Sequence, residues 1–566
     1  MRVTETPTDH TTAWLFVFAL VGFYAVFLFD NALNIPQVDD YSTLLGFLSS
    51  YLDADTWSQR ASLLFAKPSE HLLLLNRVVA LGQYYLTGAL NFRQLVFIGN
   101  GFVLLTFLLF VRQLPAGTGR PLQLMLGALM LFQPLAWHSG TWAMAALSNF
   151  GVWPLGLIAL AAANHTVLSW QRLLVALFFG LAACFTLGNG VIVLLLIPLA
   201  IAFRVRDWRA WLLAAIWLLA AFALYDLVLA NKGELVQART VNALKLVLHV
   251  PHKALLYHLV LTGYFFTDQV VLAAVFGIAG VAYSCLCLVD LVKGRASTCA
   301  LFILFIMGTL TVASLLRGPL SFLDLNISHR YWYYSQLFWF CTALDALSRL
   351  AGNPWLERDA WPGRGLLVLM LALALSRYVT ADSGISALNR DKRVGQEAWL
   401  VAGHPLSNRH LALASLAEKD LRTAIDKDIY RPFSNHPQFV KLESDSDSGT
   451  ASVNACDTGR ARAAPGAVRF EMSPGAYLHR LTGWTQFDYT LGLPTALWLC
   501  TGGGELRLPW RWTEVYMGLD QVDWEQGNIF SLYYLFEPLP TPVEQVVIEM
   551  RGSQRFLLAV ESAQAQ

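Results

Sequence analysis

Long apolar stretches recur over the first 381 residues and predict helices that cross a membrane. A spanning helix needs about 20 apolar residues, and eleven stretches come near that length. They lie at 12–29, 95–111, 121–137, 148–164, 173–186, 188–203, 211–230, 269–292, 298–316, 331–348 and 364–380. The stretches 173–186 and 188–203 are either one bent segment or two short helices joined at 186–190. Residues 1–381 are therefore expected to form a polytopic α-helical membrane domain.

The positive charges in the connections predict which helix ends lie inside. With an inner N-terminus, the outer connections around 138–147 and 187–190 carry no Lys or Arg. The inner connections carry Arg112, Arg120, Arg172, Arg204, Arg206, Arg209, Lys293, Arg295, Arg349 and Arg358. Because cytoplasmic loops are enriched in Lys and Arg, we expect a cytoplasmic N-terminus and, after eleven spans, a C-terminus on the outer side.

Two outer connections are too long for turns and have the periodicity of amphipathic helices. In the outer loop 30–94 and in 231–267, leucines recur at short, regular spacing. Apolar residues three or four apart form one face of a helix, and such helices can lie in the membrane interface. We expect interfacial helices in both connections.

Beyond residue 381 the pattern becomes that of a soluble region. Residues 382–440 are predicted to be a helical extracytoplasmic connector. After a Ser/Asp-rich segment, short runs of alternating character are separated by Gly, Pro and Asp, at 467–472, 496–500, 529–534 and 546–550. This spacing is typical of short strands, so residues 441–566 are expected to form a small extracytoplasmic β-sandwich.

Composition supports this architecture and excludes other classes. The chain is 56% hydrophobic and only 14% charged, as expected of a chain largely surrounded by lipid. A net charge of +1 provides no basic face for nucleic acid. The high apolar content excludes a disordered protein.

Two cysteines, Cys456 and Cys500, fall in the predicted soluble region. In an oxidising compartment such a pair can be bridged, and we predict a disulfide between them. The alternative is two separate buried thiols.

Adjacent carboxylates, Asp39 and Asp40, follow the first predicted span by about ten residues. Carboxylates this close raise each other's pKa and can serve as a general base or as metal ligands. The alternative is that they cap the helix beginning at Tyr41, since Asp is a preferred N-cap residue.

A second polar group follows in the same outer loop, with Glu70, His71 and Arg77. Residues three to seven apart on a helix can share one side, so these three are candidates for one polar face over an active cavity. Glu70 alone is also explained as a first-turn acid that complements the helix dipole.

A third group, His329, Arg330 and Tyr331, lies at the outer end of the tenth predicted span. Arg binds phosphate well because its planar fork of donors matches phosphate oxygens. The alternative is an interfacial anchor, in which the cation reaches the headgroups above an aromatic belt.

The acids within the spans argue against ion-coupled transport. Asp226, Asp290 and Asp345 lie toward helix ends, and no ladder of carboxylates or histidines marks an ion relay.

Together these features resemble the GT-C class of membrane glycosyltransferases. The resemblance covers roughly residues 10–350 and rests on the acidic pair, the interfacial helices after it, the Glu70–His71 and Arg77 segment, and residues 328–331. Bacterial members often carry Arg directly after the His, where this chain has Leu72.

The resemblance implies an enzyme that takes a sugar from a polyprenyl-phosphate donor and passes it to an outer acceptor. The acceptor would be a cell-surface polysaccharide, a lipopolysaccharide or a protein, and the location the bacterial cytoplasmic membrane with a periplasmic C-terminal domain. Asp40 or Asp39 would be the base and Arg330, with His329, the phosphate clamp. Glu70, His71, Arg77 and Tyr331 would contact substrate. A divalent cation, Mg²⁺ or Mn²⁺, held by the acidic pair stays an open alternative, as do a lipid-linked glycan flippase or transporter and a polysaccharide polymerase or ligase.

Overall fold

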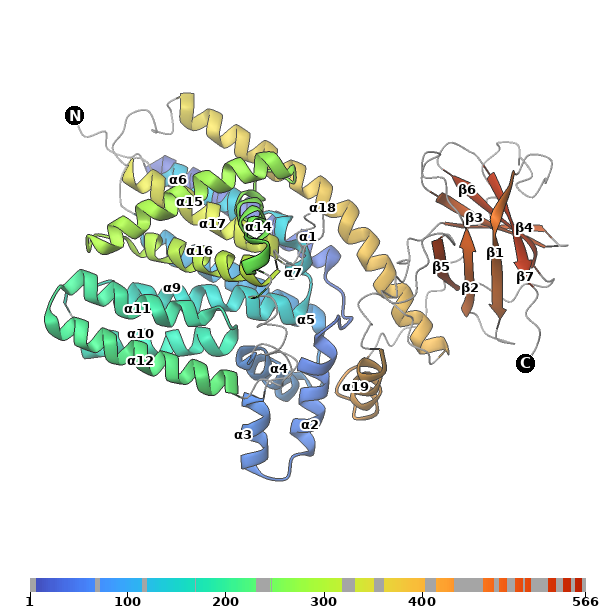
Figure 1. Ribbon diagram of the computed structural model, residues 1–566, viewed down its shortest axis with the longest axis horizontal. Coiled ribbons are helices and arrows are strands. Elements are labelled where there is room, and N and C mark those ends of the chain that lie inside the picture. Colours follow the sequence, from blue (N-terminus) through green and yellow to red (C-terminus); the bar gives the residue numbers. More distant parts are fainter. Residues whose placement is uncertain are drawn as a thin grey trace. The chain divides into compact units, whose positions relative to one another are not determined.

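The chain divides into two compact units in the structure, a computed structural model (Figure 1). The residues described are 7–66, 72–114, 120–167, 169–230, 245, 247–317, 331–350, 361–402 and 414–431, together with seven strands between 462 and 561. The first unit comprises Met1–Asn389 and Lys419–Pro432, and the second comprises Arg390–Glu418 and Phe433–Gln566. The chain thus leaves the first unit, returns to it briefly and leaves it again.

Within the described part of the first unit, six helices are long and apolar enough to cross a membrane. They lie in α1 (Pro7–Asn31), α5 (Phe92–Val111), the stretch Ala143–Ala163, α15 (Val270–Val292), α16 (Thr298–Arg317) and α18 (Trp361–Ala402). These helices confirm the expectation of a multi-pass helical membrane protein.

The other five predicted spans also contain helices. They are α6 (Arg120–Leu131), α10 (Trp170–Thr186), α11 (Gly190–Val205), α12 (Trp208–Ala230) and α17 (Trp332–Arg349). The uncertain stretch is therefore two helices, α10 and α11, joined by a turn at 187–189. The total of eleven spans stays a prediction. Helix α9 (Gly151–Ala163) packs against α10 and α11, and α11 also packs against α12 (Figure 1).

Short helices lie in the described parts of both long connections that were predicted to be helical. The outer loop contains the π-helix η1 (Tyr41–Gly46), α2 (Phe47–Asp53), α3 (Trp57–Phe65) and α4 (Leu74–Thr87). The second connection contains α14 (Pro251–Gly263).

Between α6 and α9 the chain forms four short elements. They are η2 (Pro134–Ala136), α7 (Trp137–Gly140), α8 (Ala143–Ala145) and a second π-helix, η3 (Ala146–Phe150).

Hydrogen bonds between connections sort the helix ends into two groups. At one end, the Asn164 side-chain N–H donates to the carbonyl of Ala296 (3.1 Å), and Arg204 donates to that of Gly294 (2.9 Å). At the other, the Phe92 amide donates to the side chain of Asn34 (2.8 Å), and Asn389 to the carbonyl of Asn31 (2.9 Å). We call the first the charged end and the second, which carries the outer loop, the loop end.

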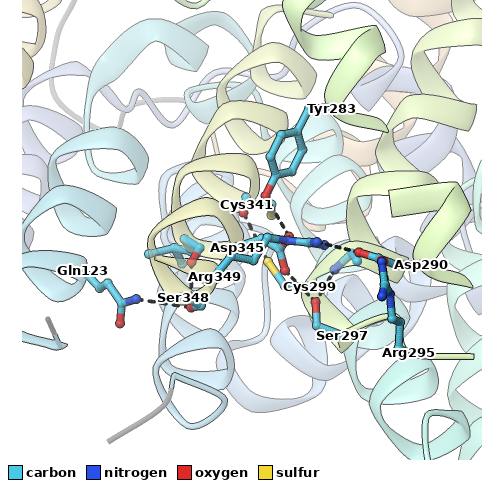
Figure 2. A network of polar contacts seen from close by, with 12 residues as sticks. Gln123, Tyr283, Asp290, Arg295, Ser297, Cys299, Cys341, Asp345, Ser348 and Arg349 are labelled. Carbon is cyan, nitrogen blue, oxygen red and sulfur yellow. Dashed lines mark hydrogen bonds and ion pairs between the residues drawn. The ribbon is translucent and has the colours of Figure 1, made fainter. Parts of the chain in front are cut away.

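A network of ion pairs ties three helices at the charged end (Figure 2). Arg349 on α17 contacts Asp290 on α15 (2.5 Å) and Asp345 (2.6 Å), and Arg295 contacts Asp290 (2.6 Å). Ser297, just before α16, donates to Asp345 (2.6 Å). The two carboxylates are 7% and 3% exposed. Because both carboxylates are paired with arginines, we interpret this network as a structural connection between the helix ends.

Helices α14 and α15 approach each other through glycines. A Cβ on Gly263 would lie 1.9 Å from the Ala273 carbonyl oxygen, and one on Gly277 would lie 2.0 Å from that of Leu259. Small residues allow membrane helices to pack backbone against backbone, and here only glycine fits.

The second unit contains a sheet of seven strands. These are β1 (Arg462–Met472), β2 (Leu478–Thr485), β3 (Pro494–Thr501), β4 (Gly504–Pro509), β5 (Asn528–Leu535), β6 (Val543–Met550) and β7 (Arg555–Glu561). Their order is β4-β3-β6-β7-β1-β2-β5, and only the β1–β7 pair is parallel among the pairings described. The four runs predicted as strands lie in β1, β3, β5 and β6. Hydrogen bonds link all seven strands in one sheet, and the predicted small β-sandwich stays a prediction.

The region predicted as a connector contains two helices. Helix α18 continues to Ala402 without a break at residue 381. Helix α19 spans Ala414–Asp426, and its last turns belong to the first unit. Cys500 is disulfide-bonded, whereas the other five described cysteines are not in disulfides. Its predicted partner Cys456 lies outside the described residues.

The close contact between α14 and α15 predicts that alanine destabilises the protein at Gly277 but not at Gly101. We expect Gly277→Ala to lower the melting temperature in detergent or nanodiscs, because overpacking costs about 1–3 kcal/mol. Gly101→Ala is the matched control, since a Cβ there meets nothing within 4 Å. Equal melting temperatures for the two variants would contradict the close packing of α14 and α15.

Candidate functional site

Asp40 is fully buried at the loop end and holds two separated segments together. One carboxylate oxygen accepts from the Gln37 backbone N–H and the other from the Met144 backbone N–H, both at 2.9 Å. Asp40 makes no side-chain cap to the helix that follows it. Asp40 instead caps the helical stretch that begins at Ala143, by accepting the amide of a residue 104 positions further along the chain. The sequence alone suggests a cap on the helix that follows Asp40 directly.

The Met144 backbone is held from a second side. The Asn76 side-chain N–H, on α4, donates to the Met144 carbonyl (2.8 Å), and Gln37 donates through its side chain to the Thr141 carbonyl (2.9 Å). We call Gln37, Asp40, Asn76, Thr141 and Met144 the Asp40 cluster. It joins the start of the outer loop, α4 and the turn before α8. Sequence reasoning missed Asn76 and Met144, because Met144 contributes only its backbone.

The backbone around this cluster is unusual at four places. Val38 and Leu73 have positive φ angles of 39° and 55°, which cost about 1–3 kcal/mol each and persist only where surrounding contacts hold them. The π-helices η1 and η3 begin just after Asp40 and Met144. Because both strained residues and π-helices concentrate at functional sites, the loop end is the candidate site.

Burial controls the ionisation of Asp40. Desolvation, together with the weaker effect of the Asp39 charge, raises the pKa of Asp40 to about 7, although the hydrogen bonds from Gln37 and Met144 oppose the shift. Asp39 is only half-buried. The two neighbouring carboxylates thus occupy different environments, and Asp39 is the one with access to solvent.

Arg77 contacts protein backbone. Its guanidinium donates to the carbonyls of Leu64 and Ala66, both at 2.6 Å, and lies 5.1 Å from the Phe47 ring centre. The side chain is buried, and desolvation lowers its pKa to about 10. Arg77 therefore caps the C-terminal end of α3 and positions the segment leading to residue 67. Glu70 and His71 lie outside the described residues.

The aromatic run at the start of α17 also lies at the loop end. Tyr331 is half-buried and stacks with Tyr334 at 6.5 Å. Tyr333 packs against Phe150 of η3 (5.9 Å) and Trp153 (5.7 Å). Through η3, α17 is thus connected to the turn that Asp40 caps. His329 and Arg330 lie outside the described residues.

Three of the sequence-predicted groups therefore have members at one end of the helical unit. Over the residues described, no group of three or more His, Cys, Asp or Glu side chains is arranged to hold a metal ion. Comparison with protein-family models, curated proteins and solved structures found no match to this chain. The site is therefore interpreted from its geometry.

The strain at Val38 predicts that glycine is more stabilising than alanine at this position, the reverse of the order in a helix. At a positive φ a Cβ costs roughly 1 kcal/mol, so we expect Val38→Gly to be more stable than Val38→Ala. At the exposed helical position Val78, we expect Val78→Ala to be more stable to unfolding than Val78→Gly by about 1 kcal/mol. Thermal unfolding of all four variants measures both differences. The same order at both positions would show that Val38 is not strained.

Burial of Asp40 predicts a pH-dependent stability. Because its pKa of about 7 exceeds the ordinary 3.8, the protonated form favours the fold. This contribution is complete below the ordinary value and is lost as the pH rises through 7. We expect melting temperatures between pH 5.5 and 8.5 to fall less in Asp40→Asn than in the wild type. Asp55→Asn, in the exposed part of the loop, should retain the wild-type slope, and an unchanged slope in Asp40→Asn would contradict the assignment.

Proposed function

We propose that this protein is a membrane glycosyltransferase that moves a sugar from a polyprenyl-phosphate donor to an extracytoplasmic acceptor. The observation that carries the proposal is the acidic pair: a buried Asp40 clamped to the Met144 amide beside a half-buried Asp39. The pair lies on a strained loop at an end of the membrane helices. A lipid-borne donor and a water-borne acceptor can meet only at such a surface.

In the proposed reaction Asp39 is the general base. Its carboxylate takes the proton of the acceptor hydroxyl while the hydroxyl oxygen attacks the anomeric carbon. The bond between that carbon and the phosphate oxygen breaks, and the polyprenyl phosphate leaves with the bonding electrons. His329 and Arg330 are proposed to hold the phosphate, as the resemblance implies, because a preorganised cation stabilises the charge developing there.

Asp40 has a positioning role in this proposal. Both of its oxygens bind backbone amides and its side chain is inaccessible to solvent, so it fixes the backbone that carries Asp39.

The disulfide at Cys500 supports an extracytoplasmic second unit, because disulfides persist in oxidising compartments. With the positive charges of the inner connections, it supports a cytoplasmic N-terminus and a periplasmic C-terminal region in the bacterial inner membrane.

The transporter alternative gains no support from the described spans. Asp290 and Asp345 are engaged in ion pairs with arginines, so neither offers an open coupling site. A polymerase or ligase would use the same kind of site to move a whole glycan, and the product of the reaction separates it from the proposed enzyme.

Asp39→Asn tests the proposed base. In cells lacking the native copy, we expect this variant to insert at wild-type abundance and melting temperature but to lose one monosaccharide from the surface glycans, read by mass spectrometry. General-base catalysis contributes about 10²–10⁴-fold, so the loss should be nearly complete. Asp55→Asn is the matched control on the same loop. Wild-type decoration in Asp39→Asn would overturn its assignment as the base, and loss of an entire glycan would favour the polymerase or ligase.

A further inference from the structure

A short segment near the end of the connector returns to the first unit and packs on the outer loop. We call residues 419–431 the clasp; it contains the last turns of α19 and the turn after it. Ala424, Ile429 and Tyr430 are almost completely buried. Nothing in the sequence pattern distinguishes this segment from the rest of the predicted soluble connector.

The clasp forms hydrogen bonds and packing contacts with the outer loop on both sides of the helices that the loop contains, including the stretch before the acidic pair. The Tyr430 hydroxyl donates to the Asn34 carbonyl (2.8 Å), and the Leu90 amide donates to the Ile429 carbonyl (2.7 Å). The Tyr430 ring packs edge-on against Phe92 at 5.4 Å. Asn34 also accepts the Phe92 amide through its side chain (2.8 Å). A residue six positions before Asp40 is thus held by both its backbone and its side chain.

The clasp also contacts the loop after the acidic pair. Asp420 packs on Gly46, the last residue of η1, where a Cβ would lie 2.8 Å from the Asp420 carboxylate. Lys427 pairs with Asp53 and donates to the Ser49 carbonyl (3.4 Å). The ion pair is exposed and adds little by itself. The contacts therefore bracket Asp39 and Asp40 on both sides.

The chain's excursion into the second unit begins near the same place. Asn389, the last residue of the first unit before the excursion, donates to the Asn31 carbonyl (2.9 Å). The two anchors, Asn389 and Tyr430, hold backbone carbonyls only three residues apart, at Asn31 and Asn34. Both fasten the stretch that leads into the acidic pair.

We propose that the clasp positions the acidic loop and that Tyr430 is its main positioning residue. The reaction it serves rests on the proposed function, but the mechanical role does not. Along the chain, residues of the second unit precede and follow the clasp.

Tyr430→Phe in the full-length protein removes the hydrogen bond to Asn34 and keeps the ring. We expect hydrogen exchange of peptides covering 32–48 to rise about three- to tenfold, the effect of one ordinary hydrogen bond on an opening equilibrium. The melting temperature should change little, and surface decoration should fall. Tyr378→Phe is the matched control, since it removes a hydroxyl-to-carbonyl hydrogen bond of similar length (3.1 Å) to Phe132 and should leave exchange at 32–48 unchanged.

Three outcomes separate the two proposals. Unchanged exchange at 32–48 in Tyr430→Phe would overturn the clasp. Suppose that Tyr430→Phe shows faster exchange but keeps wild-type decoration, while Asp39→Asn has lost that decoration. This result would overturn the positioning role of the clasp and leave the proposed enzyme activity supported. Faster exchange together with wild-type decoration in Asp39→Asn would support the clasp as a mechanical element and overturn Asp39 as the base.

Discussion

The hydrogen bond between the Asp40 carboxylate and the Met144 amide is the contact on which the loop end depends. A buried carboxylate without partners costs several kcal/mol. Here two amide donors offset part of that cost, and one of them, Met144, belongs to the first turn of the stretch Ala143–Ala163. The positive end of that helix favours the charged acid. In return Asp40 satisfies an amide that would otherwise lack an acceptor at the start of a membrane helix.

The strain at Val38 follows from the number of contacts around it. Gln37 donates to Asp40 through its backbone, accepts the Asp40 amide (2.7 Å) and donates to Thr141 through its side chain. Gln37 and Asp40 lie on either side of Val38, and Asp40 is itself held by the Met144 amide. With both residues fixed, the backbone between them has too few free torsions to relax. At the charged end, ion pairs between side chains connect one helix to another. At the loop end, side chains hydrogen-bond to backbone groups instead, and Asp39 is left half-buried.

Hydropathy predicted the helices well because lipid-facing segments must satisfy their backbone internally, and the strands in β1, β3, β5 and β6 were recognisable from alternation. The acidic pair was recognisable because two adjacent acids are unusual beside a span. The partner of Asp40 was not, since any residue at 144 offers the same amide. Arg77 was identified as polar and near the site, but not as a cap of α3, because its acceptors are backbone carbonyls. The clasp was hidden for another reason: its amphipathic helix has the same pattern whether it packs on a soluble neighbour or on the outer loop.

Two adjacent carboxylates take separate roles in one reaction when their environments differ. Two equivalent acids would share a proton and neither would have a defined role. In this site burial raises the pKa of Asp40 to about 7 and occupies both of its oxygens, while Asp39 keeps access to solvent. Environments that separate two acids in this way also separate their functions. The backbone between Asn34 and Gly46, held by the Asp40 cluster on one side and by the clasp on the other, maintains that difference, because a slip that hydrated Asp40 would make the two acids alike.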